Sequence, residues 1–281
     1  MIKTLSQTNV VYDTIMRDLK DGKVSFPRIP SHVVRIDKLI RDEDKSIKDL
    51  SRLIECEPSL AIRILQVANS SFYGSISKVN SIQQAVSRLG MTATRNVVIA
   101  LAIRDVFRSP DMFINSHLNA LWERSIDVAS LSVILARRVK LDVDVAIISG
   151  MLHDIGTLAV VGYWFNHGVK SVENKEDLMN KVAPFLSCPL GHAVLTAWNF
   201  PDDLIDVVSK QCDHNDVHVS EVQPIDLVIT AKAYINVVAD KISTDEFNNI
   251  KSVVKMKITY DDVMEMMEDF AEIRKEFFQT F

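Results

Sequence analysis

One stretch, Asp142 to Gly162, constrains the fold of this chain more than any other part of the sequence. At helical spacing its apolar residues cover nearly the whole circumference: Val143, Ile147, Gly150 and Met151 lie on one face, and Val145, Ile148, Leu152 and Ile155 on another. A helix that is apolar on nearly all sides is buried, so this stretch predicts a central helix in the core.

Two polar residues, His153 and Asp154, lie near the end of this predicted helix. At helical spacing Asp154 continues one of the apolar stripes into the interior. A buried carboxylate needs a cation or hydrogen-bond donors, because stranding one half of a buried pair costs roughly 3–5 kcal/mol. The partner of Asp154 therefore decides the function.

The 281 residues, of which 47% are hydrophobic, can bury a sizeable core in one large or two ordinary domains. Helical periods recur along the chain, and only eight glycines and eight prolines interrupt them, which predicts an all-α protein. The apolar run from Asn96 to Ile103 is far shorter than the roughly 18–20 residues of a membrane helix. The first residues lack the apolar block of a secretory signal, so we expect no membrane contact and a cytoplasmic location.

The cysteine and charge content narrows the function classes. Cys56, Cys188 and Cys212 show no CxxC spacing, which predicts reduced thiols in a reducing compartment, used as core filler.

The net charge is −5, and no basic block stands apart from nearby acids, which disfavours nucleic-acid binding. Two short helices around Gly90 are compatible with a helix-turn-helix motif, but the second is too apolar for contacts to bases or phosphates.

The predicted boundary between two helical subdomains is Ser109-Pro110-Asp111. The first subdomain would cover residues 1–110 and the second residues 111–258. A C-terminal amphipathic helix over residues 259–281 follows a capping-box pattern from Thr259 to Asp262. Its apolar side, which we expect to pack on its own domain rather than on a partner, holds Val263, Met266, Met267, Phe270, Ile273 and Phe277.

Two cations also interrupt apolar surfaces in the predicted second subdomain. Arg124 lies at the edge of the apolar face of a helix that starts near Asn115. Lys232 interrupts the apolar stripe of a helix between Pro224 and Ala239. Both are candidates to meet a buried carboxylate.

The motif GMLHDIG resembles the signature of the HD phosphohydrolase superfamily, helical enzymes whose metal is held by a histidine, a His-Asp doublet and a later aspartate. The flanking segments extend the likeness: FPRIPSHV, LIECEPSLAIRILQVANSSFYG, SIQQAVSRLG, LWERSIDVA and GHAVLTAWNFP. Over about Phe26 to Asp240 the chain resembles the HDOD family, the HD-related output domains of bacterial signalling chains. The resemblance implies an HD-like helical bundle in the second subdomain.

Matched residue by residue, the resemblance places Arg124 at the first histidine ligand and Lys232 at the last aspartate ligand. The doublet His153 and Asp154 is present, and His192 matches a histidine common in related sequences. A His-His pair often seen in relatives falls on Gln211 and Cys212.

Neither a guanidinium nor an ammonium can bind a transition metal, and two ligands out of four do not hold an ion tightly. The sequence therefore predicts that Arg124 and Lys232 neutralise Asp154 in place of a metal. We expect no metal and no cofactor; His153 and Asp154 would be the ligands if one bound.

Three functions remain open at this point. The first is a non-enzymatic signalling module that acts through protein or small-ligand contacts, with its HD-like pocket either a relic or a ligand site. The second is a metal-dependent phosphohydrolase that acts on a nucleotide or cyclic dinucleotide with Fe, Mn, Zn or Mg. The third is a sensor in which Arg124, Lys232 and His192 bind an anion such as a nucleotide without hydrolysing it.

Overall fold

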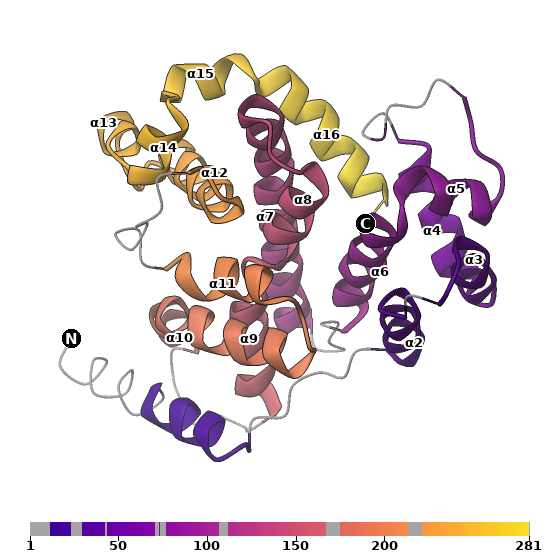
Figure 1. Ribbon diagram of the computed structural model, residues 1–281. Helices are drawn as coiled ribbons and strands as arrows, with labels where there is room; N and C mark the ends of the chain where they lie inside the picture. Colours follow the sequence, from indigo (N-terminus) through magenta and orange to yellow (C-terminus); the bar gives the residue numbers. More distant parts are fainter. Residues whose placement is uncertain are drawn as a thin grey trace.

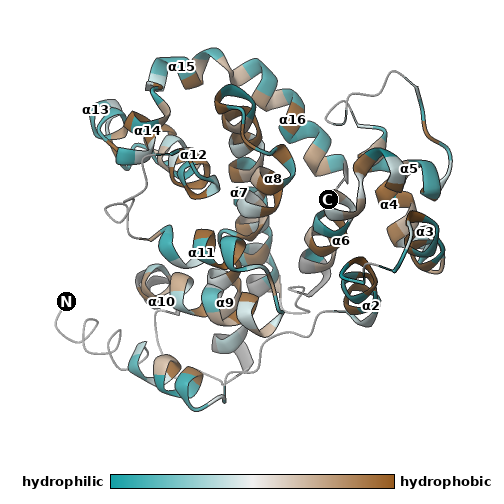
Figure 2. Ribbon diagram, in the orientation of Figure 1, coloured by the Kyte–Doolittle hydropathy of each residue, from teal (hydrophilic) through white to brown (hydrophobic). Residues whose placement is uncertain are grey.

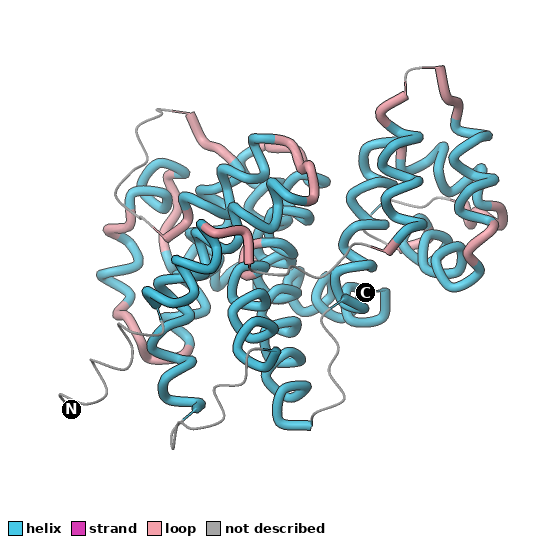
Figure 3. The backbone as a smooth tube through the Cα atoms, turned by 90° about the horizontal axis from the view of Figure 1, so that it is seen from below, coloured by secondary structure: helices cyan, strands magenta, loops and turns pink. Residues whose placement is uncertain are grey.

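The computed structural model of the protein describes residues 12–23, 30–42, 44–70, 73, 77–106, 112–166, 175–212 and 221–280. Within these ranges the chain forms helices and turns, with no strand, which confirms the prediction of an all-α fold. Figure 1 shows the helices in two groups that lie side by side, and Figure 3 shows the same separation from below.

The first group holds five helices: α2 (Ser31–Ile40), α3 (Ile47–Glu55), α4 (Pro58–Ala68), α5 (Ile82–Leu89) and α6 (Met91–Val106). Each of the four shorter helices is marginal alone, and they bury a shared core instead. Side-chain caps set two of their starts: Ser46 and Asp49 form a capping box at α3, and Ser81 caps α5. Figure 2 shows the apolar faces of these helices turned toward one another.

The second group contains α7 (Met112–Val139), α8 (Val143–Leu152), α9 (Ile155–Asn166), α10 (Lys175–Ala197), α11 (Asp202–Lys210) and α12 (Pro224–Val238). Four further helices follow in the described part of the chain: α13 (Thr244–Asn248), α14 (Lys251–Met256), α15 (Tyr260–Glu265) and α16 (Met267–Thr280). The long helix α7 forms the axis of this group, with α8, α12 and α16 packed along it.

The expected boundary at residues 109–111 lies outside the described residues, so the division of the chain into subdomains stays a prediction. The helix at residues 12–20 lies beside the second group although it precedes the first one in sequence. Its Asp18 carboxylate accepts a hydrogen bond from the Tyr163 hydroxyl of α9. The N-terminal helix therefore contributes to the core next to α9.

The predicted central helix is α8, which ends just before His153 and Asp154, and a second helix, α9, starts directly after this doublet at Ile155. Two side chains bind backbone carbonyl groups at the break. His153 Nδ1 lies 2.7 Å from the carbonyl oxygen of Gly150, and the Gln211 side chain donates to the carbonyl of His153. The stretch is buried in the core, as the sequence predicted. The stretch is apolar enough to span a membrane, yet 83% of its most apolar window is buried inside the fold, as expected of a core helix.

Two glycines let the helices approach this break closely. A methyl group on Gly150 would overlap the backbone of Ala129 in α7, and one on Gly156 would overlap the carbonyl of Ser187 in α10. Gly162, six residues further along α9, has open space around its missing side chain. Close packing on α7 and α10 therefore depends on glycine only near the break.

We predict that Gly156→Ala destabilises the protein by about 1–3 kcal/mol or more, because backbone atoms of α10 would have to move. Gly162→Ala on the same helix is the matched control and should be neutral or stabilising by up to about 1 kcal/mol, since alanine favours helix. Urea unfolding followed by circular dichroism measures both. Equal losses in the two variants would contradict the close approach.

The C-terminal region differs from the predicted single helix, because it breaks at Met266 into α15 and α16. The capping box of Thr259 and Asp262 forms as the sequence indicated. Ile273 and Phe277 are buried, and Arg274 forms an ion pair with Asp127 of α7. Helix α16 packs on α7 and also reaches α4, so it connects the two groups.

We predict that Phe277→Ala lowers the free energy of unfolding by about 3–5 kcal/mol, because its ring is only 4% exposed. The neighbouring Phe278 is 37% exposed, so Phe278→Ala should cost less than about 1.5 kcal/mol. Chemical denaturation compares the two variants. A larger loss for Phe278→Ala would mean that α16 docks through its other face.

Candidate functional site

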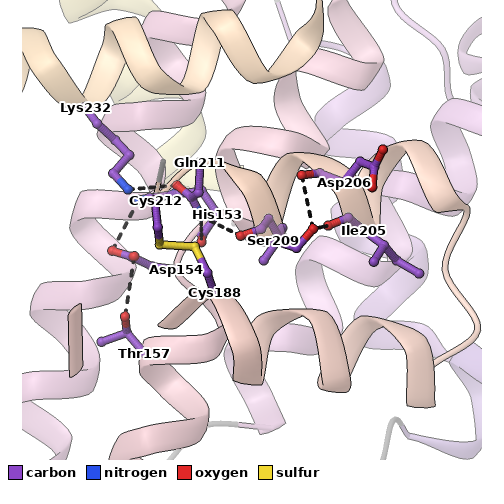
Figure 4. The surroundings of a disulfide bond; sticks show 11 residues. His153, Asp154, Thr157, Cys188, Ile205, Asp206, Ser209, Gln211, Cys212 and Lys232 are labelled. Atoms are coloured by element: carbon purple, nitrogen blue, oxygen red, sulfur yellow. Dashed lines mark hydrogen bonds and ion pairs between the residues drawn. A yellow bond between two sulfur atoms is a disulfide. The ribbon is translucent and has the colours of Figure 1, made fainter. Parts of the chain in front are cut away.

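His153 and Asp154 lie at the break between α8 and α9, where both side chains are buried. The Nδ1 atom of His153 lies 2.7 Å from the carbonyl oxygen of Gly150. Since a carbonyl only accepts hydrogen bonds, Nδ1 is the donor of this pair. Nε2 lies 3.2 Å from Oδ2 of Asp154 (Figure 4).

Two cations approach the same carboxylate from other helices. Arg124, on α7, places Nε 3.6 Å from Oδ2 of Asp154. Lys232, on α12, lies above Asp154 in Figure 4 and points toward it. Its Nζ donates a hydrogen bond of 2.8 Å to Oε1 of Gln211. We call Arg124, His153, Asp154 and Lys232 the HD cluster.

The electrostatics of the HD cluster favour an ionised carboxylate. Burial alone would raise the pKa of Asp154, but attraction to His153, Lys232 and Arg124 outweighs it and holds that pKa well below the ordinary value. For Lys232, burial lowers the pKa of the ammonium group and repulsion from Arg124 adds to the shift, while Asp154 opposes it. The carboxylate is thus neutralised by cations of the protein itself.

Gln211 holds the cluster together although sequence reasoning recorded it only as a departure from related sequences. Its side chain is buried, donates to the backbone carbonyl of His153 and accepts from Lys232. A fully buried amide needs such partners, because an unsatisfied one costs roughly 1–3 kcal/mol. The sequence signal for Gln211 is its place as a polar residue just after the amphipathic helix α11.

His192 does not join the cluster. It lies on α10, is exposed, and makes no hydrogen bond or ion pair with a residue that the structure describes. Sequence matching therefore named five site residues, of which the structure brings four together.

The prediction that the cysteines are reduced thiols is wrong for two of them, because Cys188 of α10 and Cys212 form a disulfide. Only Cys56 is free, and it is exposed rather than core filler. The cysteines of the bond are 24 residues apart, so no local motif announces it. Helix packing brings their Cα atoms to 6.3 Å, within bonding range.

The residues present do not fit a bound dication. A metal in this position would face the guanidinium of Arg124 and the ammonium of Lys232, which repel it and offer no lone pair. Among the described residues there is no group of three or more His, Cys, Asp or Glu side chains arranged to hold a metal. His153 and Asp154 are the only family-type ligands in the cluster.

Cavities lie elsewhere on the molecule. One of about 640 Å³ opens between α4, residues 77–80 and α16, and another borders α5. No residue of the HD cluster lines either of them.

The sequence matches the family model of the HDOD domain over residues 26–214. The chain belongs to the HDOD family. The match begins before α2 and ends just after the disulfide, so it covers the first helical group, helices α7 to α11 of the second group and three of the four cluster residues. Lys232 of α12 lies beyond it.

Solved structures share this fold at low sequence identity. A protein from Shewanella amazonensis SB2B, named as a candidate metal-dependent phosphohydrolase, superimposes with a TM-score of 0.83 over 96% of this chain and 99% of its own, at 23% identity. An HDOD domain protein of unknown function from Geobacter sulfurreducens gives a TM-score of 0.67 over 95% and 97% of the two chains, at 22% identity. These likenesses establish the fold of the HDOD chain.

An uncharacterised protein of Treponema pallidum (strain Nichols) is 23% identical over 205 residues, which is 70% of this chain. The chain spans 39% of the length of that relative. The relative therefore carries additional sequence outside the matched HDOD region.

We predict that Asp154→Asn destabilises the HDOD protein by about 3–5 kcal/mol at neutral pH, because it strands buried cations. Adding Lys232→Met to that variant should restore at least about 1 kcal/mol, since it removes one stranded charge. Because the folded-state pKa of Asp154 is depressed, its contribution is present above about pH 3.9 and is lost as the pH falls below it. The gap between the wild type and Asp154→Asn should therefore narrow in acid.

Urea unfolding of the four proteins in this double-mutant cycle measures the coupling. Lys232→Met alone is the control for lost packing. A coupling energy near zero would contradict the pairing of Asp154 with Lys232.

Proposed function

We propose that this HDOD chain is a non-enzymatic regulatory module of bacterial signal transduction that acts in the cytoplasm by contacting a signalling protein. The observation that carries the proposal is the HD cluster, where Arg124 and Lys232 of the protein neutralise the carboxylate of Asp154. The family resemblance supports the regulatory role.

The cluster argues against hydrolysis of phosphate esters. In a metal-dependent phosphohydrolase the metal polarises the phosphate and activates a water. Here the position of a metal is flanked by two cations, and His153 and Asp154 alone cannot hold an ion tightly. The alternative, a hydrolase acting on a nucleotide or cyclic dinucleotide with Fe, Mn, Zn or Mg, therefore lacks half of its ligands.

A second candidate is an anion sensor, and one observation favours it. Arg124 and Lys232 carry two positive charges against the single negative charge of Asp154. The Nε atom of Arg124 is buried yet makes no hydrogen bond with any described residue. An unsatisfied buried donor beside excess positive charge suits a phosphate or carboxylate group, such as that of a nucleotide. His192 is too exposed to complete such a site as first expected.

Two measurements separate these functions. Metal content after purification and dialysis, with turnover of phosphate esters in added Mn or Mg, tests the hydrolase. A pull-down from the source organism with the wild type tests for a protein partner. The destabilised variant Phe277→Ala shows whether retention of that partner requires the folded protein. A stoichiometric transition metal together with turnover would overturn the regulatory proposal. Retention of one defined signalling protein by the wild type would support it.

We predict that Arg124→His combined with Lys232→Asp recreates a ligand set of two histidines and two aspartates with His153 and Asp154. The free energy of unfolding of the double variant should then rise with added Mn or Zn, by about 2.7 kcal/mol at a hundred times the dissociation constant. Thermal unfolding in metal and in chelator measures the difference.

The wild type and the two single variants are the controls, because each keeps at least one cation beside Asp154. Their melting temperatures should not depend on added metal. A metal-dependent shift of the wild type would show that the cations do not replace the ion.

A further inference from the structure

We propose that the Cys188–Cys212 bond is a reversible thiol–disulfide switch that sets the position of Gln211, and through it that of Lys232, at the HD cluster. The inference concerns the geometry of the cluster and holds whether the cluster serves a partner or an anion. It rests on what lies at each end of the bond.

One end of the bond is fixed to the helix that follows Asp154. Cys188 is buried in α10, and the carbonyl of the preceding Ser187 packs so closely on Gly156 that no side chain fits between them. Gly156 is two residues beyond Asp154. The sulfur of Cys188 is therefore held in a constant position relative to the carboxylate.

The other end of the bond is attached to the residue that organises the cluster. Cys212 directly follows Gln211, whose side chain joins the carbonyl of His153 to the ammonium of Lys232. Figure 4 shows the disulfide between Gln211 and α10, beside Asp154. Gln211 is the C-cap residue of α11, so α11 holds it from one side and the bond of Cys212 restrains it from the other. Opening the bond leaves Gln211 held by α11, its side-chain hydrogen bonds and packing.

The surroundings of the bond suit exchange rather than a purely structural role. Cys212 is exposed, so a small thiol can reach it, whereas Cys188 is only 6% exposed. The helices that it joins already pack through buried residues of α11: Leu204, Ile205, Val207 and Val208. We therefore expect the second group to stay folded when the bond opens.

The chemistry balances as a two-electron exchange. On oxidation the thiolate of Cys212 attacks a disulfide RSSR, forming a mixed disulfide and releasing one thiolate RS⁻. The thiolate of Cys188 then attacks Sγ of Cys212, forming the protein disulfide and releasing the second RS⁻. The two protein thiols lose two electrons and two protons, and RSSR becomes two RSH. Reduction by a small dithiol runs the same steps in reverse.

The test measures two properties of the intact protein: whether the Cys188–Cys212 bond is formed, and how well ordered the backbone is around the HD cluster. Free thiols are alkylated in denaturant before and after treatment of the native protein with dithiothreitol, and mass spectrometry counts them. We expect one reactive thiol, that of Cys56, in the oxidised protein and three after reduction. Hydrogen exchange of the amides near residues 153–157 and 208–212 should become faster on reduction, on the order of tenfold, while circular dichroism keeps its helical signal.

Three variants complete the design. Cys188→Ser and Cys212→Ser should each show the fast exchange of the reduced protein and no response to dithiothreitol. Cys56→Ser should behave as the wild type, because that thiol is outside the bond. Reoxidation with glutathione disulfide should restore slow exchange in the wild type and in Cys56→Ser only.

Several results would overturn the proposal. Three free thiols in the protein after treatment with glutathione disulfide would mean that the bond does not form. Unfolding on reduction, or a bond that stays closed in dithiothreitol while the protein is native, would make it a structural staple. Unchanged exchange near residues 153–157 after reduction would show that the bond does not control the cluster.

Discussion

The buried carboxylate of Asp154 is the constraint on which the arrangement of the second helical group depends. An ionised group in the interior is stable only if charges and donors surround it, and here they come from separate helices. Arg124 fixes the position of α7, Lys232 that of α12, and Gln211 that of the end of α11. One acidic side chain thus specifies how several helices meet around the break between α8 and α9.

The same constraint explains why cations can replace a metal without loss of the fold. The buried charge of a carboxylate can be balanced in two ways. A dication can be bound by carboxylates and imidazoles, or a pair of protein cations can lie beside one carboxylate. The protein cations do so without lone-pair ligands, because Arg124 and Lys232 belong to the chain itself. Under the proposed function, the fold would need no metal, and the cluster would lack the Lewis acid on which hydrolysis relies.

Much of this arrangement could be predicted from the sequence, because burial has a periodic signature. The apolar circumference of residues 142–162 predicted a core position, and the interruptions at Arg124 and Lys232 marked the cations that face Asp154. The sequence placed His153 and Asp154 near a helix end, but it could not identify Gln211 as the donor to the His153 carbonyl, because the two residues are 58 positions apart. The Cys188–Cys212 bond was missed for a similar reason: it depends on how α10 packs against α11, and spacing along the chain does not encode that contact. His192 shows the opposite failure, where a match to related sequences named a residue that the packing leaves exposed.

Helix α11 also connects the cluster to the first helical group. The chain just before α11 is held from that group, because Arg41 of α2 donates a 2.6 Å hydrogen bond to the carbonyl of Asn199 and the guanidinium of Arg95 of α6 lies 5.3 Å from the ring centre of Phe200.

The chain just after α11 carries Gln211 and the disulfide. A short rigid helix anchored at both ends passes a displacement of one end to the other, whereas a flexible loop would absorb it. Any change in how the two groups pack would therefore act on the bonds of Gln211 to His153 and Lys232, and any change at the cluster would act on the surface where α2 and α6 meet the second group. Coupling of this kind needs no chemistry at Asp154, only a carboxylate whose partners are held by a movable helix.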